Sequence, residues 1–269
     1  MTAFELLADW PAPAPAAGII TSDGRTAVRG PAEEIRPWAS VTKIVVAYAV
    51  LRLAEAGEIS LDAPCGPPGA TLRHLLSHAS GLGPDGRRLA PPGRRRIYSS
   101  VAYEVVGDFL SDRIGRSVPE IVTELVLRPL GMHQTRLLGS PGHGMQGSLA
   151  DVLRFGAELL HPRLLSPESM LAARSVAFPG LDGVLPGFGR QSPNDWGLGF
   201  EVRDNKSPHW TSPQNSPETF GHFGQSGSFL WVDPERGLAC AALAGVPFGP
   251  WAVEAWPMFS TAVLETFGS

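Results

Sequence analysis

Apolar residues fill positions 44–51 without a break, so this segment has no polar face. That pattern predicts a helix buried on every side, because a surface helix keeps a polar stripe. Ser40 suits the N-cap and Gly57 the stop, so we expect a helix over about residues 41–56. Its first turn contains one charged residue, Lys43, and a buried charge there requires an explanation.

Short apolar runs and turn residues predict strands near both ends of the chain, with helices between them. The first two strands would turn at Asp23-Gly24, a dipeptide typical of hairpins. Strands are expected at residues 17–20, 25–29, 197–202, 228–232 and 238–246. Helices are expected at residues 41–56, 71–78, 101–114, 117–126, 152–160 and 251–267. Two polar segments rich in Gly and Pro, residues 178–195 and 204–221, are expected to be long loops.

This order of elements favours an α+β fold, an antiparallel sheet flanked by helices with a mainly helical second domain. The sheet domain would be discontinuous, formed by residues 1–60 and 190–269, and the helical domain would comprise residues 61–189. The start of the chain would complete one edge of the sheet. A chain of 269 residues is long enough to bury the core that such an arrangement requires.

The charge pattern argues against several kinds of partner. The net charge is only -4, and the one basic run, residues 94–96, is interpreted as a solvated turn, so no nucleic acid is expected. No stretch approaches the roughly 18 to 20 apolar residues that cross a membrane. The first 20 residues carry no Lys or Arg and cannot serve as a secretory signal, so we expect a cytoplasmic protein. Cys65 and Cys240 are too few for a disulfide scaffold and are expected to be reduced.

Lysine is rare in this chain. Of the 22 basic residues only Lys43 and Lys206 are lysines, so arginine supplies the positive charge almost everywhere. Arginine does not lose its proton in proteins, whereas a buried lysine readily does. A lysine kept in an apolar helix therefore suggests a titratable amine. The alternative is a surface lysine whose stem lies along the protein while its ammonium reaches water.

Ser40 and Lys43 lie three positions apart and share one face of the predicted helix. A serine hydroxyl at a helix N-terminus lies where backbone N–H groups stabilise negative charge. It becomes a nucleophile when a base removes its proton, and a neutral lysine amine within hydrogen-bond reach can be that base. Ser-x-x-Lys alone occurs by chance, so the pair gains weight only from further motifs.

Those motifs follow in order along the chain. "IYSS" places Tyr98 just before a helix, and "HFG" places His222 and Gly224 at the start of a late strand. The order Ser-x-x-Lys, Tyr-x-Asn, His/Lys-x-Gly resembles the class C branch of the serine β-lactamase, penicillin-binding-protein and esterase superfamily, in its esterase-like, family VIII carboxylesterase form. The likeness extends from about residue 17 to the end, with smaller matches at "LLSHASGL", "RPLGMHQT" and "WGLGF".

The resemblance implies a role for each matching residue. Ser40 would be the acylated nucleophile, and Lys43 would keep the neighbouring base in its active form. Tyr98 would move the proton, as base in the attack and as acid toward the leaving group. The backbone N–H groups of Ser40 and Gln225 would form the oxyanion hole, and His222 would position the substrate. No cofactor and no metal are implied.

One position departs from the family pattern. Ser100 stands where the family usually has asparagine, whose amide contacts a substrate amide and helps to fix the lysine. A shorter hydroxyl puts amide recognition in doubt and favours ester cleavage. His222 in place of the usual lysine points the same way.

Several residues have a simpler structural interpretation. Tyr98 could be a packed loop tyrosine, and His222 a core histidine. His74 and His78 have helical spacing that could bind a metal, which we do not expect because no Glu follows His74. Ser226 lies in "GQSGS", which lacks the last glycine of a nucleophile elbow and is not expected to react. Among the tryptophans, Trp210 is the one expected near the pocket.

The sequence therefore predicts a serine hydrolase that forms an acyl-enzyme on Ser40, most simply an esterase of small acyl esters. The alternatives are a β-lactamase or D-amino-acid peptidase, and a non-catalytic protein that binds a ligand or partner through the same pocket. The expected substrate is a small ester or amide. The natural substrate, the oligomeric state, and whether residues 178–195 and 204–221 cover the pocket are left open at this stage.

Overall fold

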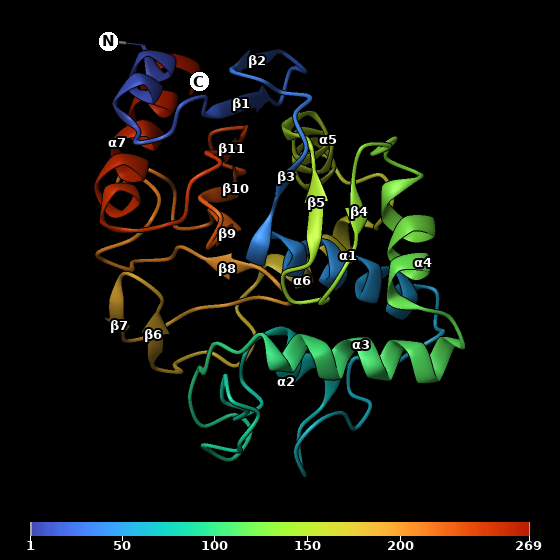
Figure 1. The fold of residues 1–269 in the computed structure, drawn as a ribbon. Coiled ribbons are helices and arrows are strands. Elements are labelled where there is room, and N and C mark those ends of the chain that lie inside the picture. Colours follow the sequence, from blue (N-terminus) through green and yellow to red (C-terminus); the bar gives the residue numbers. More distant parts are fainter. Residues whose placement is uncertain (1, 269) are drawn as a thin grey trace.

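The computed structural model of the chain describes residues 2–268. At its centre lies a six-stranded antiparallel sheet in the order β2-β1-β11-β10-β9-β8 (Figure 1). The strands are β1 (Ala16–Thr21), β2 (Thr26–Arg29), β8 (Glu201–Val202), β9 (Phe220–Gly224), β10 (Ser228–Asp233) and β11 (Leu238–Leu243). Ala16 pairs with Leu243 and Thr21 with Leu238, so the first strand of the chain lies beside the last. The prediction that the amino terminus completes the sheet is confirmed.

Both faces of this sheet are covered, which explains why its central strands read as continuous apolar runs. Along β10, Phe229 and Trp231 pack into the cluster that includes α7 (Pro250–Phe267). Leu230 and Val232 belong to the opposite cluster, on the side of α5 (Leu149–Leu160). Figure 1 shows α7 and α5 on different sides of the sheet. The alternation follows from the two-residue period of a strand.

The remaining helices lie on the α5 side and beyond it. They are α1 (Thr42–Glu55), α2 (Leu72–Leu76), α3 (Val101–Ile114), α4 (Val118–Val122), which continues as a π-helical turn over Thr123–Leu127, and α6 (Pro167–Arg174). A 3-10 helix over Ala3–Asp9 packs on the α7 side. In α1 every residue from Thr42 to Leu51 is buried, as the apolar run predicts. The observed mixture of helices and antiparallel sheet confirms the α+β class, and the proposed division into two domains stays a prediction.

Two small sheets were not predicted. One is β3 (Arg36–Pro37), β5 (Met145–Gly147) and β4 (Arg136–Leu137); the other is the hairpin of β6 (Gly183–Leu185) and β7 (Gly189–Gln191). Strands of two or three residues are too short to show an alternating pattern. The β6–β7 hairpin interrupts the segment expected to be one long loop.

The predicted strand at residues 197–202 is wrong over most of its length. Only Glu201–Val202 pair in the sheet, because Gly199 has φ +98°, a conformation that extended strands do not adopt. A Cβ added at Gly199 would lie 2.2 Å from the Cβ of Ala47 on α1. The glycine therefore lets the chain turn directly against the central helix.

The basic run at residues 94–96 is not the uniformly solvated turn that we predicted. Arg94 and Arg95 are exposed, but Arg96 is only 2% exposed. Its guanidinium donates hydrogen bonds to the carbonyl oxygens of Ser77, Ala177, Phe178 and Asn194. One arginine of the run thus ties three separate loops together.

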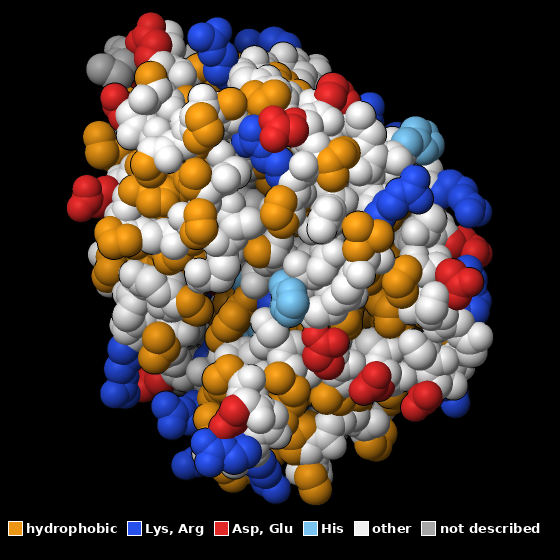
Figure 2. Space-filling model, in the orientation of Figure 1, with side chains coloured by type: hydrophobic (Ala, Val, Ile, Leu, Met, Phe, Trp, Pro, Cys, Tyr) orange, Lys and Arg blue, Asp and Glu red, His pale blue; other side chains and the backbone are white. Residues whose placement is uncertain are grey.

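The two cysteines, which we expected to be reduced, form no disulfide with each other: Cys65 and Cys240 are both buried and free. No helix within residues 2–268 is long and apolar enough to cross a bilayer. On the face seen in Figure 2, Lys and Arg side chains gather at the lower edge and do not form a stripe across it.

Gly199 provides a test of the packing between residues 197–202 and α1. We expect Gly199→Ala to lower the free energy of unfolding by about 2–4 kcal/mol, since it combines a positive-φ penalty with overpacking against Ala47. Gly57→Ala is the matched control, because Gly57 also has a positive φ, +75°, but a Cβ there meets nothing within 4 Å. Urea unfolding measures both. Equal losses in the two variants would contradict the packing argument.

Candidate active site

We predicted Ser40 as the N-cap of the buried helix, and this is wrong. Ser40 lies inside a 3-10 turn, Ala39–Val41, that precedes the helix. Ala39 has φ +44°, and the N–H of Val41 donates to the Trp38 carbonyl at 3.1 Å. The turn frees the Ser40 hydroxyl from capping the helix. The side chain instead lines a cavity, and Ser40 is 8% exposed.

The structure brings together three predicted residues, one of which, Tyr98, lies 58 positions from Ser40 in the sequence. The Nζ of Lys43 lies 3.0 Å from the Oγ of Ser40, one helical turn away. The Tyr98 hydroxyl, from the segment that leads into α3, donates to the same Oγ at 2.7 Å. Ser40 therefore sits between an amine and a phenol, each within hydrogen-bond distance.

Lys43 is completely buried, so the interpretation as a surface lysine is wrong. Burial lowers its pKa to about 7, an effect that the Glu104 carboxylate on α3 partly opposes. The rings of Tyr98 and Tyr103 lie under the Nζ, with centroids at 4.9 and 5.6 Å. Near neutral pH a large fraction of this amine is uncharged and holds a free electron pair.

Two further oxygens surround the lysine. Its Nζ donates to the Ser100 hydroxyl at 3.1 Å and to the Gly142 carbonyl at 2.7 Å. Ser100 thus contacts the lysine as the resemblance implies for the asparagine it replaces. Gly142 was not among the predicted site residues, because no pattern in the sequence connects it to Lys43, 99 positions away.

Tyr98 is held by aromatic neighbours on several sides. The ring of His78 lies 4.6 Å away, that of His222 5.7 Å and that of Trp196 5.9 Å, measured between centroids. Burial raises the pKa of the Tyr98 phenol well above its usual value, despite hydrogen bonds to Ser40 and Ser100 that lower it. The resting phenol therefore keeps its proton.

The end of β9 forms the opposite wall. His222, Phe223 and Gly224 finish this strand, whereas we expected them at its start. A Cβ at Gly224 would lie 2.5 Å from the Trp38 carbonyl oxygen, so only glycine lets the strand approach the turn that carries Ser40. Gln225 follows at the cavity wall, where the resemblance requires it.

His222 is 3% exposed, and neither ring nitrogen meets a hydrogen-bond partner among residues 2–268. Burial, together with the nearby Lys43, lowers its pKa to about 3, so the imidazole is neutral. It lines the cavity and can donate or accept one hydrogen bond there.

The cavity has a volume of about 110 Å³. It is lined by Ser40, Tyr98, Ser100, Leu185, Pro186, Trp196, Glu201, His222, Phe223 and Gln225. Figure 2 shows the molecular face hollowed near its middle, beside a histidine. Leu185 and Pro186 come from the β6 strand and the turn after it, so the segment 178–195 supplies one wall.

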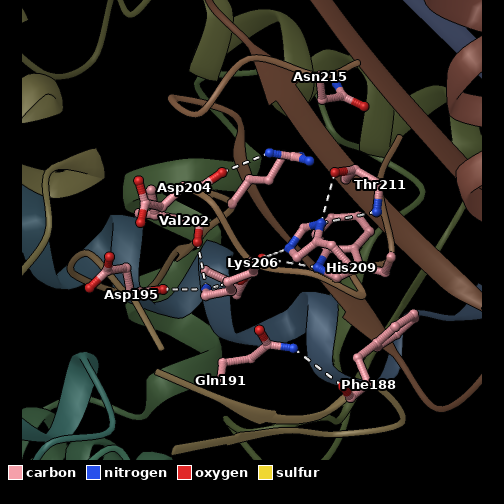
Figure 3. Close-up of polar contacts among 12 residues, drawn as sticks. Phe188, Gln191, Asp195, Val202, Asp204, Lys206, His209, Thr211 and Asn215 are labelled. Atoms are coloured by element: carbon pink, nitrogen blue, oxygen red, sulfur yellow. Dashed lines mark hydrogen bonds and ion pairs between the residues drawn. The ribbon is translucent and has the colours of Figure 1, made fainter. Parts of the chain in front are cut away.

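Glu201 is the one carboxylate on this wall, and a buried network holds it (Figure 3). Its Oε2 accepts hydrogen bonds from His209 Nε2 and Trp210 Nε1, both at 2.9 Å, and its Oε1 contacts the Lys206 ammonium. Burial would raise the pKa of Glu201, but His209 and Lys206 outweigh it and hold the carboxyl ionised.

The network corrects two expectations. Trp210 is 1% exposed and does not line the cavity, but acts on it through Glu201; Trp196, in the "WGLGF" match, is the tryptophan at the wall. The loop expected at residues 204–221 is anchored rather than open. Lys206 also donates to the carbonyl oxygens of Asp195 and Val202, at 2.6 and 2.5 Å.

The remaining candidates, His74, His78 and Ser226, have structural contacts, and of these His78 also packs against Tyr98. α2 ends at Leu76, so His74 and His78 lose the helical spacing that a shared metal would need. His74 bonds with Thr71, and His78 Nδ1 accepts from the backbone N–H of Ser99 at 3.3 Å. The Ser226 hydroxyl donates to the Pro37 carbonyl at 2.7 Å, which gives it a structural partner rather than a base.

Comparison with known sequences gives a consistent picture. A family model described as Beta-lactamase matches residues 16–259, most of the chain. Esterase EstB of Burkholderia gladioli is 34% identical over 35% of this chain and 36% of that protein. The D-alanyl-D-alanine-carboxypeptidase/endopeptidase AmpH of Escherichia coli (strain K12) is 27% identical over 38% and 37%. The matched part thus spans little more than a third of the length of these curated relatives.

Solved structures match over the whole chain. A beta-lactamase from Mycobacterium bovis is 48% identical, with a TM-score of 0.97 and 100% of both chains covered. EstCE1, described as a hydrolase with promiscuous acyltransferase activity, is 19% identical with a TM-score of 0.79, covers 97% and 96%, and shows the fold alone. These likenesses confirm the predicted β-lactamase/transpeptidase-like fold.

The Glu201 network makes a clear prediction about stability. Glu201→Gln leaves the buried Lys206 ammonium without its counter-charge and should cost about 3–5 kcal/mol of unfolding free energy. Glu218→Gln is the control, because Glu218 pairs with Arg174 at the surface and should change stability by about 1 kcal/mol at most. Denaturant unfolding compares the two. A Glu201 variant as stable as the control would show that the network does not hold this wall.

Proposed function

This chain belongs to the beta-lactamase family, and from that premise we propose that it is a serine hydrolase that forms an acyl-enzyme on Ser40. The observation that carries the proposal is the hydrogen-bonded set Ser40, Lys43 and Tyr98, of which Ser40 and Tyr98 line the cavity. A nucleophile, a neutral amine and a proton donor in direct contact are the groups that acyl transfer needs.

The first step uses the uncharged form of Lys43 as the base. The resemblance implies Tyr98 for this role, but burial raises the pKa of the phenol, which keeps its proton, whereas burial lowers the pKa of Lys43 to about 7. The Ser40 Oγ accepts a hydrogen bond from Tyr98, so its own hydrogen is free to point at the amine 3.0 Å away. As Oγ bonds to the ester carbonyl carbon, its proton passes to Nζ and the carbonyl oxygen becomes an oxyanion. The backbone N–H groups of Ser40 and Gln225 are proposed to stabilise that charge.

The second step expels the alcohol. Because its pKa is raised, the phenol of Tyr98 holds a proton to donate to the departing alkoxide, and the ammonium of Lys43 can return that proton afterwards. Water then attacks the acyl carbon and gives a proton to the neutral amine of Lys43, the carbon–Oγ bond breaks, and the ammonium passes that proton to the Ser40 Oγ 3.0 Å away. His222 is proposed to orient the substrate through one ring nitrogen.

The cavity supports a small and uncharged acyl group. A volume of about 110 Å³ accommodates only a few carbon atoms beyond the carbonyl. None of the described residues that line it is Lys or Arg, and its one charged side chain is the Glu201 carboxylate. A substrate that carries a carboxylate beside the scissile bond would meet no cation there. This favours esters of short, neutral acids over β-lactams and D-alanyl peptides.

β-Lactam or D-amino-acid peptide hydrolysis is the second candidate, because the Mycobacterium bovis protein of similar structure is described as a beta-lactamase. Ser100 argues against it, since its hydroxyl contacts Lys43 and offers no amide to a substrate. Turnover of a chromogenic cephalosporin as fast as that of a short ester would favour this candidate. Failure of all ester, amide and lactam substrates and covalent probes would favour a binding protein.

Covalent labelling tests the proposal. A fluorophosphonate should phosphonylate the protein once with loss of fluoride, and p-nitrophenyl butanoate should acylate it once with loss of p-nitrophenolate. Mass spectrometry should place either adduct on Ser40, and Ser40→Ala should abolish both. Ser226→Ala is the control and should keep the label, because its hydroxyl is bonded to Pro37. A label that persists in Ser40→Ala would refute the assignment.

The lysine predicts a pH dependence. Since the uncharged amine is the active form and burial places its pKa at about 7, kcat should rise with pH through about 7 and fall away in acid. Lys43→Arg keeps a permanent charge and should lower kcat by about 10²–10⁴-fold at every pH. Initial rates on a neutral ester give both. An arginine variant with undiminished turnover would exclude Lys43 as the base.

A further inference from the structure

The loop that presents Gly142 to Lys43 is a closed hairpin connection rather than an open strap. It joins β4 to β5 over residues 138–144. At its base the Leu138 N–H donates to the Gly144 carbonyl at 3.1 Å, and within it the Gly144 N–H donates to the Ser140 carbonyl at 2.7 Å. Its tip therefore has a defined shape before it meets the rest of the site.

The tip is docked on α3 by two contacts. The Ser140 hydroxyl donates to the Glu104 carboxylate. Pro141 lies against Gly107 one turn further along the helix, where an added Cβ would be 2.9 Å from the proline Cγ. One polar and one apolar contact thus fix the loop to the helix that follows Tyr98.

From this docking point a short chain of contacts leads to the catalytic amine. The Ser140 hydroxyl oxygen accepts the N–H of Gly142 at 3.0 Å, and the carbonyl of Gly142 accepts from Lys43 at 2.7 Å. A Cβ at Gly142 would lie 3.1 Å from the Ser100 carbonyl oxygen, so the backbone approaches closely there. The residue that orients Lys43 is therefore itself oriented by Ser140.

We propose that Glu104 and Ser140 form a latch that holds the Gly142 carbonyl against Lys43. Both are positioning residues, since neither touches the substrate cavity. The latch holds the Gly142 carbonyl as a second hydrogen-bond acceptor for Lys43, in addition to the Ser100 hydroxyl. With both N–H groups bound in this way, the electron pair of the amine stays directed at Ser40. Its effect on turnover rests on the proposed function, whereas its effect on Lys43 does not.

The charges around Lys43 determine whether loss of the latch raises or lowers the pKa of its amine. On other elements it faces His78 and His222, both held neutral by burial, and the phenols of Tyr98 and Tyr103. Glu104 is the acidic group that raises the pKa of the amine against the effect of burial. Removing its charge should make Lys43 lose its proton at lower pH.

The chain has only two lysines, Lys43 and Lys206, so ¹³Cε-lysine labelling gives two signals that Lys43→Arg assigns. Glu104→Gln keeps an acceptor for Ser140 but loses the charge, and should lower the Lys43 titration midpoint by about half a pH unit or more. Asp108→Asn is the control, one helical turn further from the lysine and exposed, and should shift the midpoint less. An unshifted midpoint in Glu104→Gln, or an equal shift in both variants, would overturn the proposal.

Turnover separates the latch from the charge. Ser140→Ala should lower kcat by about tenfold with KM nearly unchanged, whereas Glu104→Gln should retain most of the plateau kcat and move the acid limb downward. Glu104→Ala and Ser140→Ala should each lower kcat, and the double variant should be no slower than the slower single one. Losses that multiply, or a Ser140→Ala enzyme with full kcat, would show that the two residues do not act through one contact.

The two readouts distinguish the latch from the proposed function. A wild-type protein that turns over no ester, but whose Lys43 midpoint falls in Glu104→Gln and moves less in Asp108→Asn, would refute the esterase and retain the latch. If the wild type is active, but the Glu104 and Ser140 substitutions alter neither kcat nor the Lys43 titration midpoint, the proposed esterase function would stand and the latch would be refuted.

Discussion

The free energy of removing one amine from water governs this site. Lys43 is completely buried, with two aromatic rings beside its Nζ, and no carboxylate among residues 2–268 hydrogen-bonds to it. Its partners are a serine pair and the Gly142 carbonyl. These groups hydrogen-bond an ammonium but offset only part of the cost of burying its charge. The balance brings the pKa to about 7, where the amine can take a proton from Ser40 and give it up again.

The second lysine shows how the same residue type serves a different purpose when its partner changes. Lys206 is as buried as Lys43 but contacts the Glu201 carboxylate, which opposes the effect of burial on its pKa. That pair, with His209 and Trp210, anchors the loop at the edge of the sheet and fixes the cavity wall. Lys206, paired with a carboxylate, stabilises the cavity wall, whereas Lys43, which has only neutral hydrogen-bond partners, is proposed to transfer protons.

The sheet determines where the groups proposed to bind the substrate lie relative to Ser40. β9 ends at Gly224, and the absence of a side chain there lets its backbone pass the Trp38 carbonyl. The Ser228 hydroxyl, on the next strand, donates to the same carbonyl at 2.7 Å. Contacts from strands β9 and β10 thus fix the position of the 3-10 turn that contains Ser40. The residues proposed to bind the substrate and the proposed nucleophile are therefore aligned by contacts between segments that lie nearly 200 positions apart in the sequence.

Local spacing and composition were enough to predict a buried helix, a serine three positions before its lysine, most of the antiparallel strands, and the order in which Tyr98 and His222 follow. Helical period and motif order can be recognised without tertiary contacts. Three features became apparent only in the folded protein: Ser40 lies in a turn whose Ala39 has a positive φ, Glu201 lines the cavity, and the Gly142 carbonyl accepts a hydrogen bond from Lys43. Those features depend on approaches of backbone and buried charge between distant segments. No periodic pattern records such approaches, since each involves a single residue at a position that only the packed fold defines.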